Sequence, residues 1–433
     1  MTGIAQRHDA AADGGTSRRS VFIGAFAFAL AGTALAALAE PKISPDLAQR
    51  LTPAQLAAYR AYLSARGTFD KQLEMYWALI EERRDHRRRK RSTGQPFVTA
   101  DFIAEQPLKY QGPAMPPDVA QIIASLEPPA DPKEVKELPT VRDFLNAARH
   151  FYGFVPAPIA EREFKRRYAI EALAAGLSKT QVVRVYALET GGQGTVDMQA
   201  GIDPITKTGK PISSALGYAQ LLHANSISEL VKYGDQFIQR LSALAADASV
   251  PSAHAQTLPG KISAVQKMLA VARSVPNEWS QHQKLAQTPQ GYGIHALNLD
   301  ADIGPWLQVV KLKGLLTMAA ENGRANLTGA ELELMNLAGP RTGLDMMEPV
   351  GRGVPTANFF SQGGYYRNTI VREKTAAQLL AALDDRMNVN ALKPGAIEFA
   401  AVFDEVLAGL PPRPGPSRAE KPEKAKDVFA SDR

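Results

Sequence analysis

The strongest chemical signal in this sequence is a glutamate that ends an apolar, helix-like stretch. Glu189 follows Val182, Val185 and Tyr186 at spacings of 7, 4 and 3 residues, which places all four on one face of a helix. Such an apolar face packs inward, so we expect the carboxyl group to be at least partly buried. Burial raises the pKa of a carboxyl group, and a carboxyl that stays protonated near neutrality can act as a general acid.

The residues directly after this glutamate are unusual for a helix end. Thr190, Gly191 and Gly192 follow it, and two adjacent glycines leave room for a bulky ligand to approach the backbone. The sequence therefore favours a general acid at the edge of a cleft, and the competing interpretation is a solvated surface acid.

Two later segments carry side chains suited to binding a sugar. The stretch ALGYAQLL contains Gly217, Tyr218 and Gln220, and MNLAGP contains Asn336 before a turn. A glutamine in an apolar frame either orients a substrate amide or hydrogen-bonds the backbone of a loop. An asparagine at a helix end either caps the helix or hydrogen-bonds an N-acetyl group.

Taken in order, the segments ETGG, ALGYAQL and MNLAGP resemble the three motifs of soluble-lytic-transglycosylase-like proteins, which are E-S, G-L-M-Q and Y-N-A-G. The resemblance covers roughly residues 150 to 345. It implies a lysozyme-like, largely helical fold and a peptidoglycan lytic transglycosylase that needs no cofactor and no metal.

The resemblance also implies a role for each matched residue. Glu189 would protonate the oxygen between N-acetylmuramic acid and N-acetylglucosamine, and then act as the base while a 1,6-anhydro ring closes. The other matched positions would contact substrate: Thr190, Gly217, Tyr218, Gln220 and Asn336.

The sequence departs from the family pattern in two ways. Met335 stands where the family has a tyrosine, so Tyr218 or the pair Tyr365 and Tyr366 would have to compensate. The spacing between Glu189 and the second motif is also long. A catalytically silent glycan-binding or scaffolding envelope protein is therefore an alternative.

A lysozyme-type hydrolase is another alternative, because it needs a second carboxylate. Asp197 and Asp203 lie in the loop after Glu189 and are the candidates. Aspartates in such loops are more often turn residues exposed to solvent.

Composition limits the remaining options. The 433 residues are 45% hydrophobic with a net charge of +6 and contain no cysteine, which excludes disulfides, thiol nucleophiles and cysteine zinc sites. The seven histidines form no H-E-x-x-H motif, so we expect no metal site. The basic balance suits an acidic polymer such as cell wall, and we expect no nucleic-acid partner.

Four segments are predicted along the chain. Residues 1–39 read as an export signal of the twin-arginine or Sec type, cleaved near Ala39, which implies a periplasmic protein. The alternative is an inner-membrane anchor formed by residues 21–38. Residues 40–140 form a helical extension with a proline-rich linker, residues 141–409 form the catalytic domain with insertions, and residues 410–433 form a disordered tail.

Apolar periodicity predicts a mainly α protein. Capping signals mark helix starts: Ser178 and Gln181 form a capping-box pattern, and Pro45 and Pro53 stand at first helical positions. The predicted helices are one or two over 45–92, a short one over 119–126, and others over 141–152, 159–177, 178–189, 225–245, 258–275, 304–320, 328–337, 376–387 and 396–407. We expect Gly291–Gly293 to lie in a loop, and residues 247–302 to be an inserted subdomain or a lid.

The run Arg83–Arg91 is the most basic segment of the predicted extension. The favoured interpretation is a helix end exposed to solvent, where cations also suit the helix dipole. The second interpretation is weak contact with an anionic envelope surface or lipid.

Overall fold

The computed structural model describes residues 43–126 and 137–409. The predicted export signal, its cleavage site, the alternative membrane anchor and the predicted disordered tail lie outside the described residues. Within these ranges the regular elements are helices, with a few isolated β-bridges, so the prediction of a mainly α protein is confirmed. None of the described helices is long and apolar enough to cross a bilayer.

The N-terminal part consists of one long helix and three short ones. Thr52 and Gln55 form a capping box at the start of the long helix, and 40 residues at 1.5 Å per residue make it about 60 Å long. The elements are α1 (Pro45–Arg50), α2 (Pro53–Ser92), the 3-10 helix η1 (Thr99–Asp101) and α3 (Pro117–Leu126).

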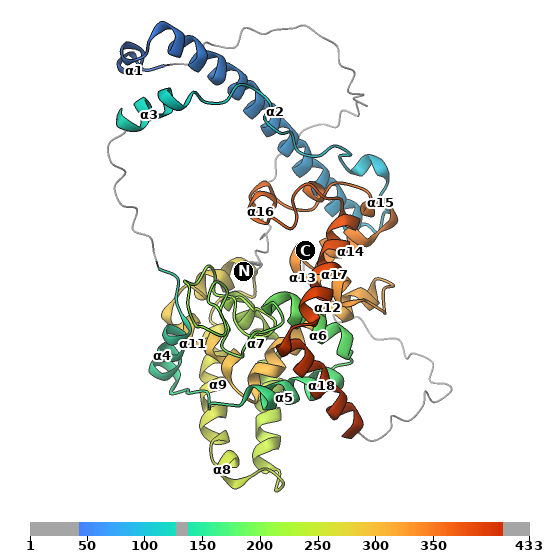
Figure 1. The fold of residues 1–433 in the computed structure, drawn as a ribbon. Helices are drawn as coiled ribbons and strands as arrows, with labels where there is room; N and C mark the ends of the chain where they lie inside the picture. Colours follow the sequence, from blue (N-terminus) through green and yellow to red (C-terminus); the bar gives the residue numbers. More distant parts are fainter. Residues whose placement is uncertain (1–42, 127–136, 410–433) are drawn as a thin grey trace.

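The long helix α2 has two different environments. Its N-terminal part extends away from the rest of the protein to α1 and α3 (Figure 1), where Leu47, Leu51 and Val119 form a small apolar cluster. Towards its C-terminus Trp77 and Ile80 belong to the main core. The second half of α2 is therefore built into the body, although the sequence suggested an extension up to residue 140.

The remaining helices form the body. They are α4 (Val141–Tyr152), α5 (Glu161–Ala174), α6 (Lys179–Thr190), α7 (His223–Ala246), α8 (Ser252–Ala255), α9 (Leu258–Ala272), α10 (Trp279–Leu285), α11 (Pro289–His295), η2 (Ala296–Leu299), α12 (Ile303–Glu321), α13 (Gly329–Ala338), α14 (Pro340–Met347), α15 (Pro349–Arg352), η3 (Thr356–Asn358), α16 (Gln362–Arg367), α17 (Ala376–Ala391) and α18 (Pro394–Gly409).

The body has two apolar cores that share helix α12. Trp306 and Leu307 of this helix pack with α4, α7, α9 and α11. One to two turns later Val309, Leu312 and Leu315 pack into the core that contains α6, α13, α17 and α18. Helix α12 therefore connects the two halves of the body.

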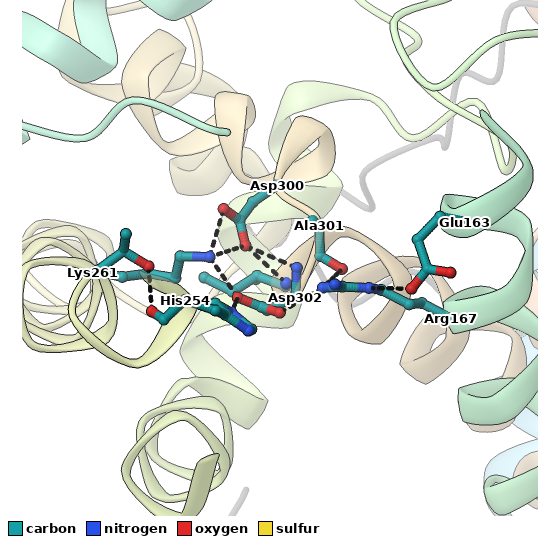
Figure 2. A network of polar contacts seen from close by, with 9 residues as sticks. Glu163, Arg167, His254, Lys261, Asp300, Ala301 and Asp302 are labelled. Atoms are coloured by element: carbon teal, nitrogen blue, oxygen red, sulfur yellow. Dashed lines mark hydrogen bonds and ion pairs between the residues drawn. The ribbon is translucent and has the colours of Figure 1, made fainter. Parts of the chain in front are cut away.

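The segment 247–302 is part of the body. Leu258, Met268 and Ile294 are fully buried in the second core. A polar network also holds this segment in place (Figure 2), in which Lys261 Nζ lies 2.8 Å from Asp300 Oδ2 and 2.5 Å from Asp302 Oδ2, and Arg167 contacts Asp302 at 2.7 Å.

The prediction of a loop at Gly291–Gly293 is wrong. Both glycines lie inside α11 and are buried. A Cβ on Gly291 would lie 2.1 Å from the Leu285 carbonyl oxygen, and one on Gly293 would lie 2.7 Å from the Tyr152 ring. The glycines therefore allow close packing of α11 on its neighbours.

Several cations of the basic run at the end of α2 bind other parts of the protein. Arg87 is buried, and its guanidinium donates to the carbonyl oxygens of Asp101, at 2.6 Å, and of Asn358. Lys90 pairs with Asp101 at 2.7 Å, and Arg91 pairs with Asp345. The prediction that the run is solvated is therefore wrong for its central part, because these cations attach α2 to the body.

Candidate functional site

Helix α6 positions Glu189 as the sequence predicted. Ser178 Oγ accepts a hydrogen bond from the Gln181 backbone N–H, and the Gln181 side chain accepts one from the Ser178 N–H, so the capping box is confirmed. Val182 and Tyr186 are buried, and Glu189 is only 4% exposed. The expected burial of the carboxyl group is therefore confirmed.

The residues after Glu189 end the helix and pack against α17 and α18. Gly191 caps α6 with φ of 66°, and a Cβ there would meet open space. A Cβ on Gly192, however, would lie 2.1 Å from the Asn390 carbonyl oxygen, and the Gly192 carbonyl accepts from Ala396 N–H at 3.0 Å. Gly192 therefore makes room for the turn between α17 and α18, and only Gly191 faces open space.

Helix α13 brings a second carboxylate and an amide to Glu189. Asn336 Nδ2 donates to Glu189 Oε1 at 3.1 Å. The same nitrogen lies 3.3 and 3.2 Å from the two carboxylate oxygens of Glu333. All three side chains are buried, so the amide links two acids that are 144 residues apart in the chain.

The surroundings of Glu333 have opposing effects on the pKa of its carboxyl group. Burial raises the pKa of Glu333 to about 7, opposed by its hydrogen bond with Asn336, by the Lys311 ammonium and by a hydrogen bond with Glu189. A neighbouring acid lowers a carboxyl pKa through a hydrogen bond when it donates its proton to the carboxylate. In the hydrogen bond between the two acids, Glu189 is therefore the donor and Glu333 the acceptor.

A buried cation lies close to this pair. Lys311 comes from α12, and burial lowers its pKa, while the charges of Glu229, Glu189 and Glu333 raise it. Neither Lys311 nor Glu333 is among the site residues predicted from the sequence. The available signal for Glu333 was its spacing of three residues before Asn336, which places both on one face of α13.

A pocket of about 280 Å³ opens beside Glu189. Glu189 lines it together with the end of α6, the following loop and the end of α17. The other lining residues are Leu188, Thr190, Gly191, Gln193, Met198, Ala200, Gly201, Ile202, Asp203, Pro204, Ile205, Thr208, Arg386, Asn390 and Lys393. None of them lies in residues 247–302, so this segment does not form a lid over the pocket.

Gln220 and Gly217 shape the loop and do not line this pocket. Gln220 Nε2 donates to the carbonyl oxygens of Gly217 at 2.8 Å and of Met198 at 3.2 Å. Both residues have positive φ, 75° at Gly217 and 42° at Gln220. Of the two roles considered for Gln220, the structure supports the one in which it fixes a loop backbone, and Met198 is itself a pocket residue.

Of the tyrosines considered as substitutes for the family tyrosine, Tyr218 and Tyr365 are core residues, and Tyr366 is 37% exposed beside Trp77. Tyr218 is 1% exposed, packs against the rings of Phe164 and Tyr186, and donates from its hydroxyl to Glu161 at 2.6 Å. Tyr365 is buried against Trp77. The expectation that Tyr218 contacts substrate therefore disagrees with its position.

Asn336 and Thr190 lie at the site in different ways. Asn336 is buried behind Glu189 and does not line the pocket, so it is placed to hold the acid. Thr190 lines the pocket, and its hydroxyl donates to the Tyr186 carbonyl at 2.7 Å. Met335 is fully buried in the core.

The two aspartates considered as a second catalytic carboxylate have structural partners. Asp197 pairs with Lys207 at 2.8 Å and accepts a hydrogen bond from Thr195. Asp203 accepts from the backbone N–H groups of Ile205 and Thr206. These hydrogen bonds lower the pKa of Asp203, and it is the one of the two that lines the pocket.

Among the residues that the structure describes, no group of histidine and acidic side chains is arranged to hold a metal ion. The comparisons with known proteins add no assignment: no family model, no curated protein and no solved structure matches this chain.

Proposed function

We propose that this protein is an exported lytic transglycosylase that cleaves the glycan strands of peptidoglycan, with Glu189 as its single acid and base. The observation that carries the proposal is the position of Glu189. Glu189 is one of the residues that line the pocket, while Asn336 behind it donates to its Oε1 at 3.1 Å. A buried, oriented carboxyl group at a pocket wall is what protonation of a glycosidic oxygen requires.

The reaction needs no external water. Glu189 donates its proton to the oxygen between N-acetylmuramic acid and N-acetylglucosamine, and the bond from the muramic C1 to this oxygen breaks. The resulting Glu189 carboxylate then takes the proton of the muramic 6-hydroxyl. The 6-oxygen bonds to C1, which closes the 1,6-anhydro ring and restores the acid.

The position of Glu333 favours this route over hydrolysis. Retaining glycosidases place their two carboxyl groups about 5 to 5.5 Å apart and inverting ones about 6.5 to 9.5 Å apart. Glu333 and Glu189 are hydrogen-bonded to each other, so they are too close to enclose a water molecule or a sugar carbon. Asp203, at the pocket wall, is the residue on which a lysozyme-type mechanism would depend.

A catalytically silent glycan-binding protein is the second candidate. The observation that favours it is the pocket size, because about 280 Å³ is at the lower limit for ligand pockets and accommodates a short part of a strand. Met335 also stands at the position of the family tyrosine and lies in the core, so this position supplies no hydroxyl group to the pocket.

Digestion of peptidoglycan tests the proposal. We expect the purified chain to release 1,6-anhydro-muropeptides from sacculi, detected by mass spectrometry. Glu189→Gln keeps the shape but has no proton to donate, so the rate should fall about 100-fold or more. Glu321→Gln, at the exposed end of α12, is the control and should keep the rate.

Each alternative predicts a different result. Products with reducing ends and no anhydro ring, lost in Asp203→Asn, would indicate a lysozyme-type hydrolase. Binding to sacculi without any soluble product would indicate the silent glycan-binding protein.

A further inference from the structure

Three helices place ionisable side chains together behind the candidate acid. Glu189 comes from α6, Glu333 from α13 and Lys311 from α12, and all three are buried. Isolated charges are rare in protein interiors because they lose their hydration. The positive and negative charges of these buried side chains must therefore neutralise one another.

The charge balance is complete when the two acids share one proton. Lys311 contributes one positive charge, and Glu229, at the edge of the group, pairs with Lys232 at 3.5 Å. With one proton on the acid pair, Lys311 and the remaining carboxylate neutralise each other. A second ionisation would place two carboxylates in hydrogen-bond contact without water, which is strongly unfavourable.

On the neighbouring helices α14 and α17, two acids are paired elsewhere, and Arg386 of α17 lines the pocket. Helices α14 and α17 also pack against α13, but Asp345 of α14 pairs with Arg91. Asp384 of α17 pairs with Arg184 at 2.6 Å. The groups that act on Glu333 are therefore its hydrogen-bond partners Asn336 and Glu189 and the charge of Lys311.

We propose that Glu333 is a positioning residue that keeps the shared proton on Glu189, with Lys311 stabilising the carboxylate of Glu333. Asn336 Nδ2 lies within 3.3 Å of both oxygens of Glu333 and within 3.1 Å of Glu189 Oε1. This bridge fixes the two carboxyl groups against each other. Glu189 lines the pocket and Glu333 does not, so the proton is held on the acid that is nearer to a bound ligand.

The arrangement also favours recovery of the proton. When Glu189 gives its proton to the leaving oxygen, both carboxyl groups carry a negative charge beside a single Lys311. Glu189 is then a stronger base than an isolated carboxylate, and it recovers a proton from the sugar hydroxyl. This inference rests on the proposed function for its catalytic consequence, but the shared proton can be measured without any substrate.

The pH dependence of activity separates positioning from a merely structural role. In Glu333→Gln, Glu189 faces Lys311 without a competing carboxylate, so it ionises at lower pH. We expect the alkaline limb of the kcat/KM profile to move down by at least one pH unit. In Lys311→Met the negative charge loses its counter-ion, and the limb should move up. A loss of rate in both variants with unchanged limbs would overturn the proposal.

Carboxyl titration gives the second readout, with no glycan present. In the full chain labelled with carboxyl ¹³C-glutamate, NMR should show two coupled titrations that Glu189→Gln and Glu333→Gln each reduce to one. Glu321→Gln should leave both unchanged. If the two titrations are coupled but the protein cleaves no glycan, the proposed function is refuted and the proposal of a shared proton stands. If the two carboxyl groups titrate independently near pH 4, the proposal of a shared proton is refuted and the proposed function stands.

Thermal unfolding of each variant shows whether it is folded before either readout is interpreted. Gln at position 333 retains an oxygen that can accept from Asn336, so we expect this variant to fold. If Glu333→Gln does not fold, Lys311→Met provides the test, because its alkaline limb is expected to move to higher pH.

Discussion

Two cationic residues distinguish the pocket from an uncharged sugar site. Arg386 and Lys393 line it together with Glu189, and both are exposed. Neither has an ion-pair partner among the described residues, whereas Arg184, which precedes the site on α6, is paired with Asp384. The pocket therefore presents two cations without ion-pair partners beside the Asp203 carboxylate.

A substrate with carboxylate groups would use this charge. We expect the double variant Arg386→Glu/Lys393→Glu to raise KM for peptidoglycan fragments about tenfold, since each exposed pair contributes roughly 0.5 to 1 kcal/mol. The same fragments with amidated carboxyl groups should show little change between variant and parent. Arg60→Glu, on the exposed part of α2, is the control, and an equal rise in KM there would contradict a local effect.

At the scale of elements, Arg87 is the main attachment of α2 to the body. Its guanidinium donates to two backbone carbonyls and lies 4.6 Å from the centre of the Phe102 ring and 5.6 Å from that of Phe359. Burial lowers its pKa to about 10, so the charge is retained at neutral pH. Loss of the side chain would leave buried carbonyl groups without donors.

We therefore expect Arg87→Met to lower the free energy of unfolding by about 2 to 4 kcal/mol, as measured by urea denaturation. Arg88→Ala, in the adjacent position but exposed and paired only with Asp85, should change it by less than about 0.5 kcal/mol. Hydrogen exchange should also accelerate in residues 97–106, which contact this part of α2. Equal effects of both substitutions would show that Arg87 has no special role.

Local signals in the sequence were sufficient for most helices and failed where contacts decide the structure. The capping box at Ser178 and the prolines at positions 45 and 53 marked helix starts correctly. Gly291 and Gly293 lower helix propensity, and only the neighbouring Leu285 and Tyr152 show why glycine is needed inside α11. The role of Arg87 likewise depends on Asn358, which lies 271 residues later.

For the whole molecule, the candidate site depends on distant segments that the two cores bring together. Burial of Glu189 followed from its own helix, but its contact with Asn336 spans 147 residues. Lys311 reaches the pair because α12 runs through both cores. An isolated lysine on an apolar helix gives no sign of its partners in the sequence, so the charge balance of the site required the structure.

Stability in acid is a property of the whole fold, and buried histidines reduce it. His295 is fully buried at the end of α11, with Nδ1 2.8 Å from Ser226 Oγ and Nε2 2.8 Å from the Ser214 carbonyl oxygen. A carbonyl only accepts, so Nε2 carries the proton and Nδ1 accepts from the serine. Burial lowers the pKa of His295 to about 3 and that of the neighbouring His223 to about 4.

These low pKa values make the fold less stable as the pH falls. Between pH 6.5 and about 3 the unfolded chain binds a proton at residue 295 and the folded chain does not, so the free energy of unfolding decreases with falling pH. From pH 6.5 to 5 the loss from His295 amounts to about 2 kcal/mol, at roughly 1.4 kcal/mol per pH unit.

The variant His295→Gln tests this contribution, because its amide can donate to the Ser214 carbonyl and cannot titrate. We expect this variant to be less stable at pH 7 but to show a shallower slope in urea denaturation between pH 6.5 and 5, while the exposed His150→Gln keeps the parental slope. A parental slope in His295→Gln would show that other groups cause the acid sensitivity.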